Sequence, residues 1–151
     1  MDEAALETEQ YWDSLQSGLT EGEIMVTDSG EKPWGQVLMD SSHLLFADEP
    51  EVLQGKNTGP TPTDLVLMAL GGCTAITCRM YAARKGWQID RIAVRLRYKS
   101  EDHMSISRVI ELDGPLDAEQ RERIFQIAEK CPVHKMLTQT VSVATELAPA
   151  A

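Results

Sequence analysis

Alternating apolar and polar residues predict six strands in this sequence. Several short segments show the period of two that is typical of strands with one buried face. Clusters of Gly, Pro, Ser and Asp separate them, as expected for turns. The candidate strands are residues 23–27, 36–40, 43–47, 91–98, 104–112 and 140–147. We expect the fourth and fifth to pair antiparallel, because one follows the other directly along the chain.

A long apolar segment after the third strand predicts a helix with clear boundaries. Thr61 suits the N-cap, Pro62 suits the first helical position, and Asp64 follows three residues after the cap, as in a capping box. The helix is expected to run to Arg84 and to end at Gly86. Further helices are predicted over residues 2–16 (a helix or arm), 117–130 and 132–137. The apolar side of the second of these is formed by Leu116, Ile124, Ile127 and Ala128.

The order of these elements is typical of an α+β fold with a mostly antiparallel sheet. The length of 151 residues suits one domain, and we predict an acidic helix or arm over residues 1–19 and a folded domain over residues 20–151. Residues 65–83 are apolar on nearly every side, and such a helix is buried all round. A single small domain can hardly enclose it, so we expect a partner subunit. Small residues would let another backbone approach: Ala69, Gly71, Gly72 and Ala75.

The charge balance excludes some partners. The formal net charge is −10, whereas nucleic-acid binding needs clustered Lys and Arg, so neither nucleic acid nor an anionic membrane surface is expected. The N-terminus is acidic, unlike a secretory signal. The apolar run 65–78 stops at Arg79, short of the roughly 20 residues that a membrane-spanning helix needs. Three cysteines do not suggest a secreted disulfide framework, and we predict a cytoplasmic protein.

The three cysteines have the most distinctive chemistry in the chain. Cys73 and Cys78 are separated by about 140° around a helix and do not face the same way. Cys131 immediately precedes Pro132 and would be the N-cap of a short helix, where backbone N–H groups lower a thiol pKa. Inert core positions are an equally open interpretation of all three thiols. A zinc site made of the three cysteines and His134 is a weaker alternative, because the first two side chains diverge.

Two segments together resemble the OsmC/Ohr superfamily, and in particular its OsmC-like branch. They are GPTPTDLVLMALGGCTAITCRMYAARKGW at residues 59–87 and CPVHKML at residues 131–137. The segments FADEP, GKNTGPTP and LDGPLDAEQRERIFQIAEKCPVHK also fit that branch, so that the resemblance covers roughly residues 20–147.

The resemblance implies an intertwined homodimer, in which antiparallel sheets wrap around long buried central helices and the active sites lie at the interface. It also implies a thiol-dependent peroxidase acting on organic hydroperoxides, with Cys73 as the peroxidatic and Cys131 as the resolving cysteine. Cys73 would become a sulfenic acid, Cys131 would condense with it to a disulfide, and a dithiol reductant would restore both. No metal, haem or flavin cofactor is implied. A lipophilic pocket would be supplied by Leu67, Met68, Leu70 and Ile76.

Two other residue types of the family bear on the prediction. An acidic residue near the start of the central helix matches Asp64, here Asp and not Glu. Because it stands about 13 Å along the helix from Cys73 and half a turn round, it would serve the partner's site, and its capping role is an equally open interpretation. The family's early-strand Arg has no counterpart, since the first Arg is Arg79. A second function therefore stays open, a non-enzymatic redox-sensing or ligand-binding module, and Cys78 is expected to be a buried spectator.

Overall fold

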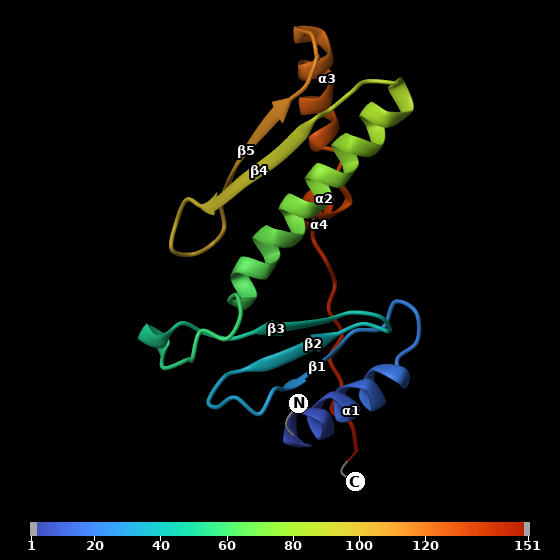
Figure 1. Ribbon diagram of the computed structural model, residues 1–151. Helices are drawn as coiled ribbons and strands as arrows, with labels where there is room; N and C mark the ends of the chain where they lie inside the picture. The colour runs from blue at the N-terminus through green and yellow to red at the C-terminus, as the bar shows by residue number, and fades with distance from the viewer. Residues whose placement is uncertain (1–2, 150–151) are drawn as a thin grey trace. The chain divides into compact units, whose positions relative to one another are not determined.

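The computed structural model describes residues 3–149, with side chains described from residue 9. The chain divides after Leu65 into two compact units, each of which is described by itself below (Figure 1). The predicted N-terminal helix is α1 (Glu3–Ser17), and position 2 of that prediction lies outside the described residues. The predicted boundary between residues 19 and 20 is not tested by this division and stays a prediction.

The first unit is a three-stranded antiparallel sheet covered by α1. Its strands are β1 (Met25–Asp28), β2 (Gln36–Met39) and β3 (Leu44–Ala47), paired in that order. The three predicted strands are therefore confirmed. Val37 and Met39 point to one face of β2 and pack with Trp12 of α1 into a buried cluster. Gln16 fastens the helix to the β2–β3 turn, because its side-chain amide donates to two backbone carbonyls there.

A buried carboxylate shapes the loop that leads to the central helix. Asp48 is 3% exposed and accepts hydrogen bonds from the backbone N–H groups of Glu49, Lys56 and Thr58. Burial raises the pKa of Asp48, but these hydrogen bonds outweigh it and leave the pKa below its ordinary value. The loop also contains the short helical turn η1 (Glu51–Leu53). One side chain thus folds the segment of residues 49–58 into a compact turn before the helix.

The central helix is α2 (Pro62–Lys85), with the boundaries that the sequence predicts. At its start, Thr61 Oγ1 accepts from the Asp64 N–H at 3.1 Å and donates to the Asp64 carboxylate at 2.8 Å. At its end, Gly86 takes a φ of 68°, the left-handed conformation that glycine adopts without strain. Helix propensity and capping therefore act together to place these ends.

The second unit packs α2 and a third helix against a two-stranded sheet. β4 (Arg91–Tyr98) and β5 (Ile106–Asp113) pair antiparallel, as predicted. α3 (Ala118–Ala128) begins with a capping box between Asp117 and Gln120, and α4 (Pro132–Leu137) follows. The core of this unit consists of Cys78, Ala82, Leu116, Ile124 and Ala128, with Ile92, Ile110 and Leu112 of the sheet packed against it. All four residues predicted for the apolar side of α3 are buried.

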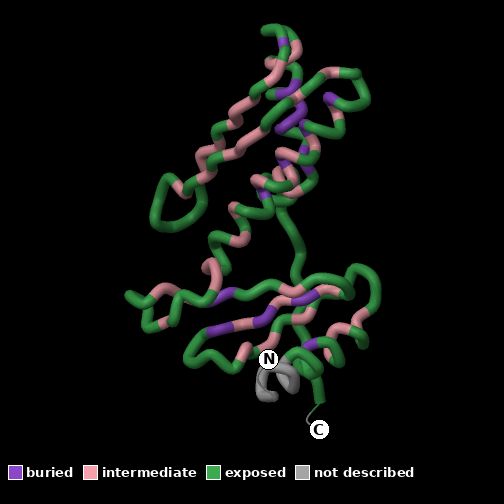
Figure 2. The backbone as a smooth tube through the Cα atoms, viewed as in Figure 1, coloured by how far each residue is buried: buried purple, intermediate pink, exposed green. Residues whose placement is uncertain are grey.

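Burial along α2 is one-sided in this chain, and the predicted cover by a partner subunit stays a prediction. The helix is not buried all round within this chain, because its buried residues form one stripe spaced by four: Leu70, Thr74, Cys78 and Ala82. Figure 2 shows that the rest of the helix is intermediate or exposed. Met68 is 58% and Ile76 61% exposed, since this unit provides packing partners for only one side of the helix.

The predicted sixth strand is wrong for this chain. Residues 140–147 have no strand structure, although their alternation is strand-like. Val143 and Leu147 are largely exposed. A strand needs a neighbour to pair its backbone groups, and no described residues pair with this segment.

Candidate active site

Two of the three thiols meet in the second unit. Cys73 lies midway along α2 and is partly exposed, whereas Cys131 is the buried N-cap residue of α4. The two side chains form a hydrogen bond with one another. This contact arises because α3 ends at Ala128 and Pro132 starts a new helix at once, so that the short connection carries Cys131 to the side of α2.

The hydrogen bonds divide the pair into an acidic and a weakly acidic thiol. Burial is the largest single influence on the pKa of Cys73 and raises it. Hydrogen bonds from the Cys131 thiol, the Val133 N–H and the Thr77 hydroxyl together outweigh burial, and the pKa lies below its ordinary value of 9.0. The pKa of Cys131 is raised, first by burial and then by donation of its proton to Cys73. The negative charge of the pair therefore resides on Cys73, where a thiolate is available as a nucleophile.

The third thiol is separate from this pair. Cys78 is fully buried, and its Sγ lies 3.7 Å from the carbonyl oxygen of Ile124, to which it donates. Burial raises the pKa of Cys78 to about 11, against a smaller lowering by the charge of Arg108. Cys78 is thus a protonated core residue, as the sequence predicts.

A half-buried arginine stands beside the thiol pair and was missed from the sequence. The Arg108 side chain is 11% exposed. Its guanidinium donates to Thr74 Oγ1 at 3.0 Å, to the carbonyl of Ala128 at 3.4 Å and to the carboxylate of Glu129. Thr74 follows Cys73 in the chain. The signal was present, because Arg108 interrupts the inward-facing apolar positions of β5, where a charge requires buried partners.

A cleft of about 360 Å³ opens next to these residues. Its walls come mainly from α2, β5, α3 and α4, and they combine apolar side chains with charged and polar ones. The lining residues are Leu70, Met104, Ile106, Arg108, Ile110, Phe125, Glu129, His134, Leu137 and Thr138. Of the four residues predicted to form a lipophilic pocket, only Leu70 lines this cleft. His134 lines the cleft from the first turn of α4, three residues after Cys131.

The sequence-predicted ligand of a zinc site has another partner. His134 Nε2 lies 3.2 Å from Glu129 Oε2, an ion pair when the histidine is protonated. Within residues 3–149, no group of three or more His, Cys, Asp or Glu side chains is arranged to hold a metal ion. The zinc alternative therefore gains no support from the described side chains.

The third predicted site residue, Asp64, is exposed and is paired with Thr61 at the start of α2. Its carboxylate makes the capping contact already described. A catalytic role for Asp64 stays a prediction. Of the three predicted site residues, the fold brings Cys73 and Cys131 together.

Only one of the two central glycines needs to be small within this chain. A Cβ at Gly71 would lie 2.9 Å from Leu96 Cδ1 of β4, whereas a Cβ at Gly72 would meet no atom within 4 Å. Gly71 therefore lets α2 approach the sheet closely. No contact among the described residues explains Gly72.

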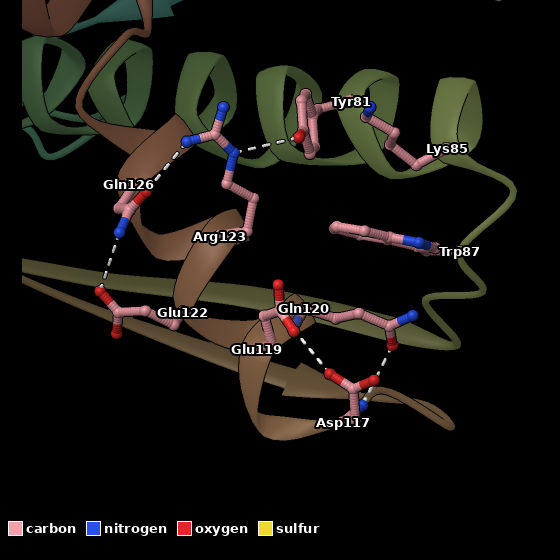
Figure 3. Close-up of a pocket in the computed structure, with 9 residues that line it drawn as sticks. All are labelled: Tyr81, Lys85, Trp87, Asp117, Glu119, Gln120, Glu122, Arg123 and Gln126. Atoms are coloured by element: carbon pink, nitrogen blue, oxygen red, sulfur yellow. Dashed lines mark hydrogen bonds between the residues drawn. The ribbon is translucent and has the colours of Figure 1, made fainter.

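A second, larger hollow of about 560 Å³ lies between the end of α2 and α3 (Figure 3). Several of its polar groups bind one another. Arg123 donates to the Tyr81 hydroxyl at 3.1 Å and to Gln126 at 3.0 Å, and Gln126 donates to Glu122. The edge of Trp87 meets the Tyr81 ring. No cysteine lines this hollow.

Comparison with known proteins assigns the family. Residues 55–146 match the family model for OsmC-like proteins. The chain belongs to the OsmC-like protein family. The match includes both cysteines of the pair and all the elements from α2 to α4. Its α+β architecture, with antiparallel sheets and a long helix, is the OsmC-like fold.

Solved structures show the same fold. A Psychrobacter arcticus protein named for osmotic stress induction and detoxification has a TM-score of 0.67 at 21% identity, over 77% of this chain and 89% of that one. An OsmC-like protein of Mycoplasma pneumoniae has a TM-score of 0.63 at 17% identity, over 79% and 88%. An organic hydroperoxide resistance protein OsmC of Legionella pneumophila has a TM-score of 0.53 at 16% identity, over 77% and 89%. None of the curated proteins compared with the sequence matches it.

Family membership also guides the interpretation of α2. By length and composition alone, this helix could cross a membrane. The sequence suggests otherwise, because the apolar run 65–78 is shorter than a membrane-spanning helix needs. Core helices of soluble proteins meet the same criterion, and the fold of this family favours a core helix here. A cytoplasmic location stays a prediction.

Proposed function

We propose that this OsmC-like protein is a thiol-dependent peroxidase that reduces organic hydroperoxides. The observation that carries the proposal is the hydrogen-bonded pair of Cys73 and Cys131, whose pKa values are shifted in opposite directions. Such a pair has a nucleophile and a nearby thiol with which to close a disulfide. Apolar side chains in the wall of the adjacent cleft, among them Leu70, Ile110 and Phe125, suit an organic peroxide better than hydrogen peroxide.

The proposed cycle balances with a dithiol as reductant. The Cys73 thiolate attacks one peroxide oxygen, the O–O bond breaks, and the alkoxide leaves as an alcohol after taking up a proton. Cys73 is then a sulfenic acid. Cys131 attacks its sulfur, water leaves, and the disulfide forms. A dithiol returns two electrons and two protons to the pair.

We further propose that two copies assemble through α2. Val66, Ile76 and Met80 are 38%, 61% and 59% exposed. At 100° per residue they fall, with Cys73, within about 80° of the helix circumference. Burial of this apolar stripe against a second copy would place Cys73 at the interface. Asp64 would then act in the partner's site, and the reducing conditions of the cytoplasm would suit the three free thiols.

Peroxide consumption tests the proposed reaction. Purified protein is given cumene hydroperoxide or hydrogen peroxide and a dithiol, and the wild type is compared with Cys73→Ser and Cys131→Ser. We expect catalytic turnover in the wild type, preference for the organic peroxide, and loss of turnover in both variants. Cys78→Ala is the matched control, because its thiol lies outside the pair.

The Cys131→Ser variant separates the two steps of the cycle. It should still consume about one equivalent of peroxide per Cys73 and accumulate the sulfenic acid, which a dimedone adduct detected by mass spectrometry would reveal. Slow oxidation of the wild type without turnover would contradict the peroxidase and would indicate the redox-sensing module instead.

A further inference from the structure

Side chains outside the thiol pair bind the α3–α4 connection, which contains Cys131, at several points. Cys131 lies between Ala128, the last residue of α3, and Pro132, the first of α4. Its own backbone N–H makes a long bond of 3.4 Å to the carbonyl of Ala128. A short connection of this kind does not by itself define the distance from Cys131 to another helix.

Arg108 connects the two segments that carry the thiols, α2 and the α3–α4 connection. From β5 its guanidinium reaches Thr74 on the buried side of α2. The same group reaches the carbonyl of Ala128 and the carboxylate of Glu129. The guanidinium of Arg108 therefore binds the residue next to Cys73 and the residues just before Cys131. It can do so because it is planar and carries several N–H donors in a fixed arrangement.

Glu129 extends the link to the other side of Cys131. Its second carboxylate oxygen lies 3.2 Å from Nε2 of His134 in α4. His134 stands in α4, three residues after Cys131. Contacts that start from Arg108 thus hold the chain both before and after Cys131.

We propose that Arg108 is a positioning residue that holds Cys73 and Cys131 within reach of each other and thereby favours their disulfide. This inference rests on the proposed function for its redox cycle, but the disulfide itself forms with any disulfide oxidant. Arg108 acts through geometry. Its charge affects the pKa of Cys78 and is not among the causes of the Cys73 shift.

Equilibration with glutathione tests the proposal without any peroxide. In that reaction oxidised glutathione takes two electrons from the reduced pair, which gives the Cys73–Cys131 disulfide and two molecules of reduced glutathione. The equilibrium constant measures how well the fold presents the two sulfurs to each other. We expect Arg108→Gln to lower the equilibrium constant at least about tenfold. Arg108→Lys should lower it less, because a Lys ammonium can still donate to some of the acceptors, although it cannot reach all three at once.

Arg121 provides a matched control. It too is a half-buried arginine of the second unit, and it donates to three backbone carbonyls, those of Leu112, Gly114 and Leu116. Arg121→Gln should lower the thermal midpoint as Arg108→Gln does, yet leave the glutathione equilibrium within about twofold of the wild type. Equal equilibrium constants for Arg108→Gln and the wild type would overturn the proposal.

Thr74→Val decides the matter if Arg108→Gln does not fold. This substitution keeps the approximate shape of the side chain and removes the hydroxyl that accepts from Arg108 and donates to the Leu70 carbonyl within α2. We expect about a threefold lower equilibrium constant and a higher pH midpoint for alkylation of Cys73. An unchanged constant would overturn the proposal, as would a wild type that forms no Cys73–Cys131 disulfide. Lack of peroxide turnover with an intact disulfide equilibrium would contradict only the peroxidase.

Discussion

The two hollows of the second unit differ in chemistry more than in size. The hollow between Tyr81 and Arg123 is the larger, at about 560 Å³ against about 360 Å³. Several of its polar groups are hydrogen-bonded to one another, and no cysteine lines it. The smaller cleft adjoins a thiol pair with a lowered and a raised pKa. Volume alone therefore does not identify the site, and the proposal of the thiol side rests on two thiols whose pKa values are shifted in opposite directions by their mutual hydrogen bond.

The largest effect is expected when the proposed nucleophile, Cys73, is removed from the thiol side. We expect Cys73→Ser to lower peroxide turnover by more than about 10³-fold, the scale on which removal of a catalytic nucleophile acts. The measurement is the initial rate of cumene hydroperoxide consumption with a dithiol. Retention of more than a tenth of the rate would place the reaction elsewhere in the molecule.

Helix α3 lies beside both hollows, so a substitution that destabilises this helix should destabilise both regions. Ile124 of α3 is fully buried in the core of the second unit, and Ile124→Ala should lower the free energy of unfolding by about 2–5 kcal/mol through lost contacts and a cavity. Urea unfolding at fixed protein concentration measures this. Val143→Ala, at a position 82% exposed, is the control and should change the free energy by less than about 0.5 kcal/mol.

Alkylation of the reduced protein should sharpen the distinction between the thiols as pH changes. Iodoacetamide reacts with the thiolate, so reactivity rises with pH through the pKa of each cysteine. Cys73 should have a midpoint below 9.0, because its pKa is lowered. Cys78 should stay unreactive until pH approaches 11, because burial raises its pKa to about 11. Peptide mapping by mass spectrometry assigns each rate, and a Cys73 midpoint above 9.0 would contradict the hydrogen-bonded arrangement.

The smallest effect is expected in the larger hollow. Arg123→Gln removes the hydrogen bond to the Tyr81 hydroxyl, which is the main cause of the lowered pKa of Tyr81. The pKa of Tyr81 should therefore rise, as ultraviolet titration of the phenolate would show. Peroxide turnover should change by less than about twofold, as for other surface substitutions. A large loss of turnover would assign the larger hollow a part in the reaction.

Local patterns predicted most of the secondary structure. The ends of α2 follow from Thr61 and Gly86, and the start of α3 follows from Asp117, because caps act within one turn of a helix. Five of the six predicted strands are present. The segment 140–147 failed because alternation describes what a strand needs but does not supply a neighbour to pair with.

The candidate site was predicted only in part. Resemblance to a family pointed to Cys73 and Cys131, while helix geometry alone showed merely that Cys73 and Cys78 diverge. Arg108 was overlooked although β5 and its pairing were anticipated. Its partners Thr74 and Glu129 come from two other helices, so no spacing along the chain relates them.

Short-range forces set the identity and limits of each element here, since capping, turn formation and hydrophobic periodicity depend on residues a few positions apart. The sequence pattern therefore suffices for the helices, for most strands and for the general α+β class. Contacts between segments distant in the chain were settled only when β5, α2 and the α3–α4 connection packed together. Burial and the hydrogen bonds formed there make one thiol acidic and the other not, because a pKa depends on the atoms around a group and not on its neighbours in sequence.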